Sequence, residues 1–307
     1  MKRYKNLFAT VLTHAAPSSN YRGEGEASRN VIQRIGKDGK EYAVISPEAI
    51  RNALRETLIY YGLPNNRSRL KEAGQPAVKY ESLPDADKYA DDFLFGFLVA
   101  KKDYVNQLQN QNKPAKGDSV FRQNLALATA PYRHDDTMHQ SPIFNRKLGS
   151  PWENTDKESA LLYREVSHTA FQFPFALAYA DCKDKKEWVK ALLEAISELN
   201  NVAGNHARSY YEMSPRSIVA RLTPRLTAGF NTYGFNDLGK FQDLSRIKET
   251  DLPGSEFWVG GEIVRNMSIA EKAEKQRLED EGVKFYENPE KLLFDIADAF
   301  LNQKEES

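Results

Sequence analysis

The order of the expected elements constrains this chain most: strand, helix, strand, strand, helix, strand. A short apolar run at 5–13 predicts the first strand. Ser46, Pro47 and Glu48 form a helix start, because serine caps free N–H groups, proline suits the first helical position and glutamate suits the positive end. Apolar residues at 3.6-residue spacing follow until Gly62 ends the helix.

The rest of the order comes from four later segments: strands at 120–129, 161–179 and 217–222, and a helix over 185–199. Pro174 inside the second of these strands predicts an edge position or a bulge, and Asp184 is expected to cap the helix. The order predicts an α+β fold with a ferredoxin-like, RNA-recognition-like (RRM-like) βαββαβ core. One face of the sheet in such a domain is open and often holds single-stranded RNA.

Other signals add elements around this core: a hairpin turn at Asp38-Gly39, a capping box of Ser268 and Glu271, and a helix start at Asn288-Pro289. Three stretches, 62–87, 107–119 and 131–159, are polar and long enough to be functional insertions. We therefore expect one elaborated domain over 1–307 with large insertions.

The composition excludes several classes of protein. No apolar run approaches the ~20 residues that span a bilayer, and the first residues lack the apolar core of a signal peptide. Cys182 is the single cysteine, so an internal disulfide is excluded. These features predict a cytoplasmic protein without a membrane partner.

The net charge is zero, but the charges are unevenly distributed. Residues 1–80 hold 14 Lys/Arg and 7 Asp/Glu, whereas residues 251–307 hold 7 Lys/Arg and 14 Asp/Glu. A basic front can bind phosphates, and an acidic back allows copies to stack head to tail. The alternative is ordinary solvated surface.

Arg51 and Arg55 lie one helical turn apart on the side expected to be opposite the apolar stripe. Two planar guanidinium groups in a row suit successive phosphates. The alternative is a solvated helix face with local ion pairs to Glu48 and Glu56.

Two polar loops supply further candidate contacts. Asn20 and Arg22 follow the first strand beside a tyrosine and a glycine, a combination that suits a stacked base and a nearby phosphate. Asn205, His206 and Arg208 follow the second predicted helix and offer donors to sugar or phosphate. A simple polar turn is the alternative for the second loop.

His134, Asp135 and Asp136 form the segment that most resembles a metal or acid–base cluster. A catalytic metal site needs further ligands from separate elements, and no second His-Asp pair exists in the sequence. The signatures G-x-x-x-x-G-K-[ST], H-E-x-x-H and C-x-x-C are absent. We expect no catalytic set, no metal and no cofactor. The alternatives are a metal-dependent ribonuclease that uses this segment, or an RNA-processing enzyme with His14 or His206 as base.

Four stretches are familiar as a set: ATVLTHAAPSSNYR at 9–22, ISPEAIRNALR at 45–55, DFLFG at 92–96 and GNHARSYYEMSPRSIVARLT at 204–223. In this order and spacing the chain resembles the DevR-type backbone subunit of type I CRISPR effector (Cascade) complexes, in the RAMP family. The resemblance implies a palm with the RRM-like core, a helical fingers insertion at 62–119 and a long β-hairpin thumb at 131–160.

The family likeness also implies a function. Copies would assemble head to tail along a CRISPR guide RNA and present it for pairing with target DNA, together with other Cascade subunits. The thumb would displace a guide base with an apolar tip, for which Met138, Ile143 and Phe144 are candidates. The guide RNA would contact Asn20, Arg22, Ser46, Arg51, Arg55, Asn205, His206 and Arg208. Related type III subunits cut RNA with a loop aspartate, so Asp135 or Asp136 keeps the ribonuclease alternative open.

Overall fold

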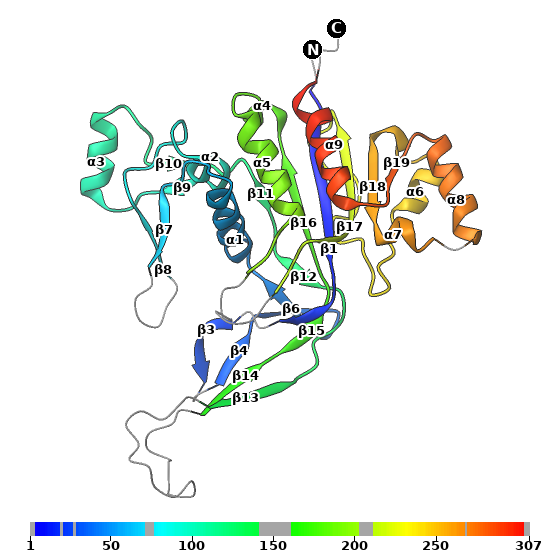
Figure 1. Ribbon diagram of the computed structural model, residues 1–307, viewed down its shortest axis with the longest axis horizontal. Helices are drawn as coiled ribbons and strands as arrows, with labels where there is room; N and C mark the ends of the chain where they lie inside the picture. Colours follow the sequence, from blue (N-terminus) through cyan, green and yellow to red (C-terminus); the bar gives the residue numbers. More distant parts are fainter. Residues whose placement is uncertain are drawn as a thin grey trace, which may run out of the picture.

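The computed structural model describes residues 4–18, 21–26, 29–70, 77–140, 161–202, 211–267 and 269–303. Within these residues a mixed sheet of nine strands forms the centre of the molecule (Figure 1). Its strands run in the order β19 (Lys284–Tyr286), β18 (Phe257–Gly261), β17 (Pro215–Thr223), β1 (Asn6–Thr13), β16 (Phe171–Leu177), β12 (Ala126–Ala128), β6 (Lys40–Ile45) and β5 (Arg34–Lys37), and β11 (Arg122–Gln123) also pairs with β16.

The expected order of elements is present in the middle of this sheet. Along the chain it reads β1, α1 (Pro47–Tyr60), β12, β16, α5 (Lys186–Ser197) and β17. In space the four strands are neighbours in the order β17, β1, β16, β12. α1, α5 and α9 (Pro289–Leu301) cover one face, where apolar residues such as Val11, Leu54 and Leu192 form one buried cluster.

Local sequence signals correctly predicted two helix starts and one turn. The side chain of Ser46 accepts a hydrogen bond from the Ala49 N–H (3.2 Å), and Asn288 accepts one from the Glu290 N–H (2.9 Å). Asp38 has φ 53° and Gly39 has φ 71°, as a tight turn between β5 and β6 requires.

The start of α5 differs from the prediction. The residue that precedes the helix is Lys185, and no side chain caps the first turn, so the expected cap at Asp184 is wrong. The predicted capping serine Ser268 lies outside the described residues, and α8 (Ile269–Asp280) begins directly after it.

Pro174 lies in an interior strand, so the predicted edge position is wrong. It stands opposite Thr10 of β1. The irregularity in the strand pairing lies on the other side of Pro174, in the segment that contains β11 and β12. There β11 pairs with Phe175 and Ala176, β12 pairs with Phe171 and Gln172, and the pairing is interrupted between them. The interruption accommodates a residue that has no N–H to donate.

The second face of the sheet is covered, which corrects the expectation of an open face. Residues 224–256, which we call the strap, cross this face and include α6 (Leu244–Lys248) and the 3-10 turn η1 (Gly254–Glu256). The Thr10 hydroxyl donates to the Thr232 carbonyl (2.9 Å), and the Gln172 amide donates to the Phe235 carbonyl (2.9 Å). Apolar residues of β1, β17 and β18 are buried under the strap.

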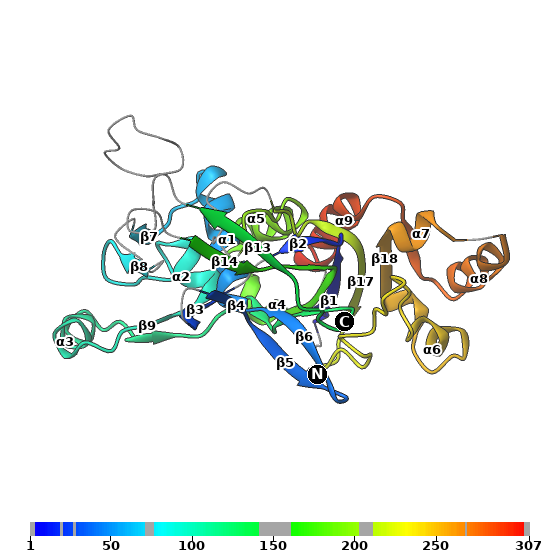
Figure 2. The same ribbon diagram turned by 90° about the horizontal axis from the view of Figure 1, so that it is seen from below.

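Smaller elements lie at the ends and below the sheet (Figures 1 and 2). One end carries β7 (Arg67–Leu70), β8 (Ala77–Tyr80), α2 (Ala90–Phe95), β9 (Phe97–Leu98), α3 (Lys102–Asn110) and β10 (Lys116–Gly117). The opposite end carries α7 (Glu262–Arg265) and α8. Below the sheet lie β2 (Ala16–Ser18), β3 (Tyr21–Glu26), β4 (Arg29–Ile32), β13 (Asp136–Gln140), β14 (Leu161–Glu165) and β15 (Ser167–Thr169), while α4 (Tyr179–Cys182) follows β16. None of the helices in the described ranges has the length and apolar character to cross a bilayer.

Candidate nucleic-acid interface

One end of the central sheet gathers the long insertions of the chain. Because neighbouring strands here are antiparallel, β1 and β12 end where β16 and β17 begin. The segments 14–33, 129–170 and 199–214 all leave or enter the sheet at this end, which lies at the bottom of Figure 1. Polar insertions from separate parts of the sequence therefore meet along one edge.

β13 and β14 form an antiparallel arm that projects from this end (Figure 1). Their register runs from Asp136 opposite Glu165 to Gln140 opposite Leu161, and β14 also pairs in parallel with β4. The arm lies at the start and end of the predicted thumb. Ile143 and Phe144, the two later tip candidates, lie outside the described residues.

Met138 and Tyr163 form an exposed apolar pair on the arm. They stand directly opposite each other in the ladder, with 64% and 44% of their surfaces exposed. Residues opposite each other in an antiparallel ladder point to the same face and touch. Sequence reasoning singled out Met138 but missed Tyr163, because the register across the intervening segment was not readable from local signals.

The buried carboxylate of Glu165 ties the arm to the rest of the sheet. It accepts hydrogen bonds from the Ile32 N–H (3.1 Å) and the Tyr132 hydroxyl (3.2 Å). Arg34 lies 3.9 Å from the same carboxylate, 2.8 Å from Glu41, and over the Tyr132 ring at 4.5 Å. The network joins β4, the β5–β6 hairpin and the base of the arm.

His134 has polar partners on both ring nitrogens. Nε2 lies 3.2 Å from Asp136, while Nδ1 lies 3.3 Å from the Tyr132 hydroxyl and 3.8 Å from Glu165. Asp135 accepts from the backbone N–H of Asp136 (2.9 Å). Among the residues that the structure describes, no group of three or more His, Cys, Asp or Glu side chains could hold a metal ion.

Arg51 and Arg55 differ sharply in their surroundings. Arg51 is half-buried, donates to the Phe121 carbonyl (3.3 Å), and its Nε has no hydrogen-bond partner in the described structure. Arg55 is buried, with Nε 3.4 Å from Asp91 and its guanidinium 5.3 Å from the centre of the Phe95 ring. Burial lowers the pKa of Arg55 to about 10, and the positive charge of the nearby Arg67 acts in the same direction. The expectation that both side chains lie on an open helix face is therefore wrong for Arg55.

Arg55 is buried because the DFLFG segment packs against α1. Asp91 and Asp92 hold the chain around Asn66: the Asn66 N–H donates to Asp91 (2.8 Å) and its amide donates to Asp92 (2.8 Å). Arg67 lies 2.9 Å from Asp92 and 3.5 Å from Asp91. Burial raises the pKa of Asp91, although its contacts with Asn66 and Arg67 act in the opposite direction. The motif thus anchors the fingers-type insertion to the first helix.

The loop before β17 is closed by a short ladder. The Asn201 N–H donates to the Tyr211 carbonyl (2.9 Å) and the Met213 N–H donates to the Leu199 carbonyl (2.8 Å). Tyr211 is buried, which raises the pKa of its hydroxyl, and the side chain of Ser18 partly opposes this shift.

Most of the predicted contacts in those loops cannot be placed. Asn20, Asn205, His206 and Arg208 lie outside the described residues. Arg22 belongs to β3, whose backbone pairs with β4. Ser46 acts as the cap of α1, so its side chain is already engaged.

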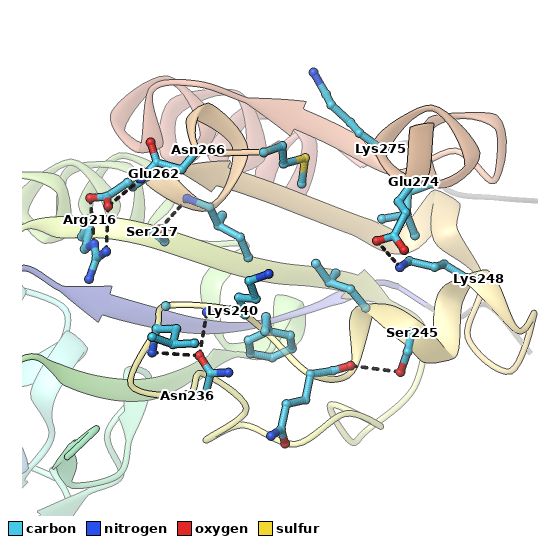
Figure 3. A pocket seen from close by; sticks show the side chains of 18 residues that line it. Arg216, Ser217, Asn236, Lys240, Ser245, Lys248, Glu262, Asn266, Glu274 and Lys275 are labelled. Carbon is cyan, nitrogen blue, oxygen red and sulfur yellow. Dashed lines mark hydrogen bonds and ion pairs between the residues drawn. The ribbon is translucent and has the colours of Figure 1, made fainter. Parts of the chain in front are cut away.

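A hollow of about 380 Å³ lies between α7, α8 and the strap (Figure 3). Two nitrogens of Arg216 donate to the two oxygens of Glu262 at 2.7 Å, which lowers the pKa of Glu262, and Lys248 lies 2.6 Å from Glu274. Lys240 and Lys275 also line the hollow, so its walls hold four cationic side chains and two carboxylates.

Comparisons with known proteins show which proteins this chain is similar to in sequence and in fold. A curated relative, the "CRISPR-associated protein Cas7/Cst2/DevR" of Myxococcus xanthus (strain DK1622), is 28% identical over 285 residues, which are 87% of this chain and 90% of that protein. This chain is similar in sequence to a Cas7/Cst2/DevR protein. The resemblance to DevR-type subunits seen in the sequence is thereby confirmed. No family model matches the chain.

Solved structures share the fold of this chain. A chain titled "CRISPR RNA-guided surveillance complex, pre-nicking" superposes with a TM-score of 0.59 at 12% identity, covering 96% of this chain and all of that chain. A chain of another "CRISPR RNA-guided surveillance complex" gives 0.56 at 13% identity, covering 96% and 99%. At this identity the likeness establishes a common fold.

Proposed function

We propose that this chain is a non-catalytic backbone subunit of a type I CRISPR effector complex. It binds guide RNA, assembles head to tail along it and presents it for pairing with target DNA, together with other Cascade subunits. The observation that carries the proposal is the match to a Cas7/Cst2/DevR protein over 87% of the chain. The fold shared with chains of CRISPR RNA-guided surveillance complexes supports it.

In this proposal the chain is one elaborated domain with three parts. The palm is the split βαβ core of β1, α1, β12, β16, α5 and β17, which has the strand order of ferredoxin-like domains. The fingers are the insertion at 62–119, which contains α2 and α3. The thumb is the insertion at 131–160, whose described part is the strand β13.

The guide RNA would lie across the end of the sheet where the insertions meet, since the strap covers the sheet face. Arg51 would contact a phosphate through its half-buried guanidinium, while Arg55 positions α1 against the fingers. The loop residues Asn20, Arg22, Asn205, His206 and Arg208 would line the same path, with Ser46 at the start of the helix. Met138 would displace a guide base with Ile143 and Phe144, and its partner Tyr163 adds a ring on which a base can stack.

Arg51 gives the direct test of RNA binding. Arg51→Gln should weaken binding of single-stranded RNA about three- to sixfold near physiological salt and reduce the salt slope by about one phosphate contact. The effect should be the same for unrelated sequences. Fluorescence anisotropy at several salt concentrations measures both quantities.

Arg122→Gln is the matched control, because Arg122 is an exposed arginine of β11 paired with Asp181 at 2.8 Å. It should bind RNA like the parent chain. Equal affinities and slopes for Arg51→Gln and the parent would remove Arg51 from the interface. RNA cleavage in Mg²⁺ or Mn²⁺ that disappears in Asp135→Ala would instead favour the ribonuclease.

A further inference from the structure

A second hollow, of about 390 Å³, lies in the fingers-type insertion between β8, β9 and α3. Its walls include Tyr80, Pro84, Leu98, Lys101 and Tyr104. Figures 1 and 2 show these elements at the end of the molecule opposite α8, and Figure 1 shows them away from the arm. The guide path proposed above makes no use of them.

The hollow exposes large apolar and aromatic side chains. Leu98 is 67% exposed, Tyr104 46% and Tyr80 38%, which is unusual for three such residues around one small cavity. A cationic side chain also lies over each of the two tyrosine rings. The Arg67 guanidinium lies 5.1 Å from the centre of the Tyr80 ring, and the Lys101 ammonium lies 5.1 Å from that of Tyr104.

The surroundings of the hollow are basic. The strands β7 and β8 contain Arg67, Arg69 and Lys79 and no carboxylate, and Arg67 is paired with Asp91 and Asp92. The start of α3 adds Lys101 and Lys102 against Asp103. The carboxylates beside the hollow are neutralised, because Glu81 lies 3.4 Å from Lys79 and Asp85 lies 2.7 Å from Lys113.

We infer that this hollow is a stacking site for a base of single-stranded DNA, with the backbone phosphates beside the strands β7 and β8 and the start of α3. Tyrosine rings beside cations accept any base, because every base has a π-face. The volume lies within the range of small-ligand sites. A basic flank favours a phosphate backbone over an uncharged peptide in the same groove.

The choice of DNA rests on the proposed function. When a guide pairs with one strand of a duplex, the other strand is displaced and its bases are unstacked. A stacking site at a distance from the guide path suits that strand. It would hold the strand without reading its sequence, and so would favour opening of the duplex at every target alike.

Tyr104 provides the test. The probe is a fluorescent single-stranded DNA with no complementarity to the guide, added to the RNA-bound protein. Tyr104→Ala should weaken DNA binding about 5- to 150-fold, the effect of losing one stacked base, while RNA binding stays unchanged. Tyr104→Phe keeps the ring and should bind DNA within about twofold of the parent.

Tyr60→Ala is the matched control, since Tyr60 is an exposed tyrosine at the end of α1 that does not line the hollow. It should leave DNA binding unchanged. Parent-like DNA binding by Tyr104→Ala would overturn the inference. So would reduced association between copies with unchanged DNA binding, because the hollow would then be a protein contact.

Photo-crosslinking separates this inference from the proposed function. The isolated chain is irradiated with an iodouracil-substituted DNA, and the modified peptides are identified by mass spectrometry. Crosslinks at Tyr80 or Tyr104 support the stacking site even when the chain fails to assemble on RNA. Crosslinks confined to other regions would overturn it even when assembly on RNA succeeds.

Discussion

Arg221 shows how a single buried residue fixes the surface available to a ligand. Its Nε and Nη2 each lie 2.7 Å from one oxygen of Glu256, and Nη1 donates to the Ala228 carbonyl (2.7 Å). The guanidinium also lies over the Phe257 ring at 5.3 Å. Arg221 therefore joins β17 to both ends of the strap and closes the second face of the sheet.

Arg221→Ala should destabilise the protein by about 3–5 kcal/mol, because it leaves Glu256 without its partner and removes buried packing. Urea unfolding followed by circular dichroism measures the change. Arg122→Ala, which breaks an exposed pair, should cost at most about 1 kcal/mol. Equal losses for the two variants would show that the strap does not depend on Arg221.

At the scale of elements, local signals predicted what local forces determine. The start of α1, the turn at Asp38-Gly39 and the start of α9 follow from side-chain caps and positive φ angles within a few residues. The edge position predicted for Pro174 and the cap predicted at Asp184 are wrong because the strand neighbours and the start of α5 depend on tertiary packing.

The candidate site depended more on long-range contacts. Sequence spacing placed Arg51 and Arg55 on one helix, but the burial of Arg55 comes from Asp91 and Phe95, about 40 residues further along the chain. The strap and the pairing of Met138 with Tyr163 likewise join distant segments, and no periodicity in the sequence signals them.

Gly96 controls how the fingers-type insertion is attached. It has φ 68°, and a Cβ there would lie 2.6 Å from the Gly117 carbonyl oxygen and 2.7 Å from the Ser119 nitrogen. Gly96→Ala should therefore cost about 1–3 kcal/mol from backbone strain alone and loosen the β9–β10 pairing. Urea unfolding gives the first quantity, and amide hydrogen exchange of β9 and β10 gives the second.

The control at this scale is Gly36→Ala in β5, where no atom lies within 4 Å of an added Cβ. It should change stability by less than about 0.5 kcal/mol. A Gly96→Ala protein as stable as this control, with unchanged exchange, would contradict the account of the junction.

The whole molecule presents three separate regions of surface. Insertions meet at one end of the sheet, the fingers-type insertion lies at one side, and the lobe with α7 and α8 lies at the other (Figures 1 and 2). The first 80 residues are basic and the last 57 are acidic, and the two stretches meet where the Lys5 N–H donates to the Gln303 side chain (2.7 Å). When a contact joins two different surfaces of identical copies, each added copy is rotated relative to the previous one. If these rotations do not bring the last copy back to the first, the assembly grows as an open helical filament.

Size-exclusion chromatography with light scattering, with and without a single-stranded CRISPR RNA, tests the central claim most directly. The account predicts large particles only with RNA, a mass that increases with RNA length, a loss of assembly at high salt and intact RNA on a gel. If the protein kept the mass of a single chain with every RNA tested, or if the RNA were shortened after incubation, the proposed role would be contradicted.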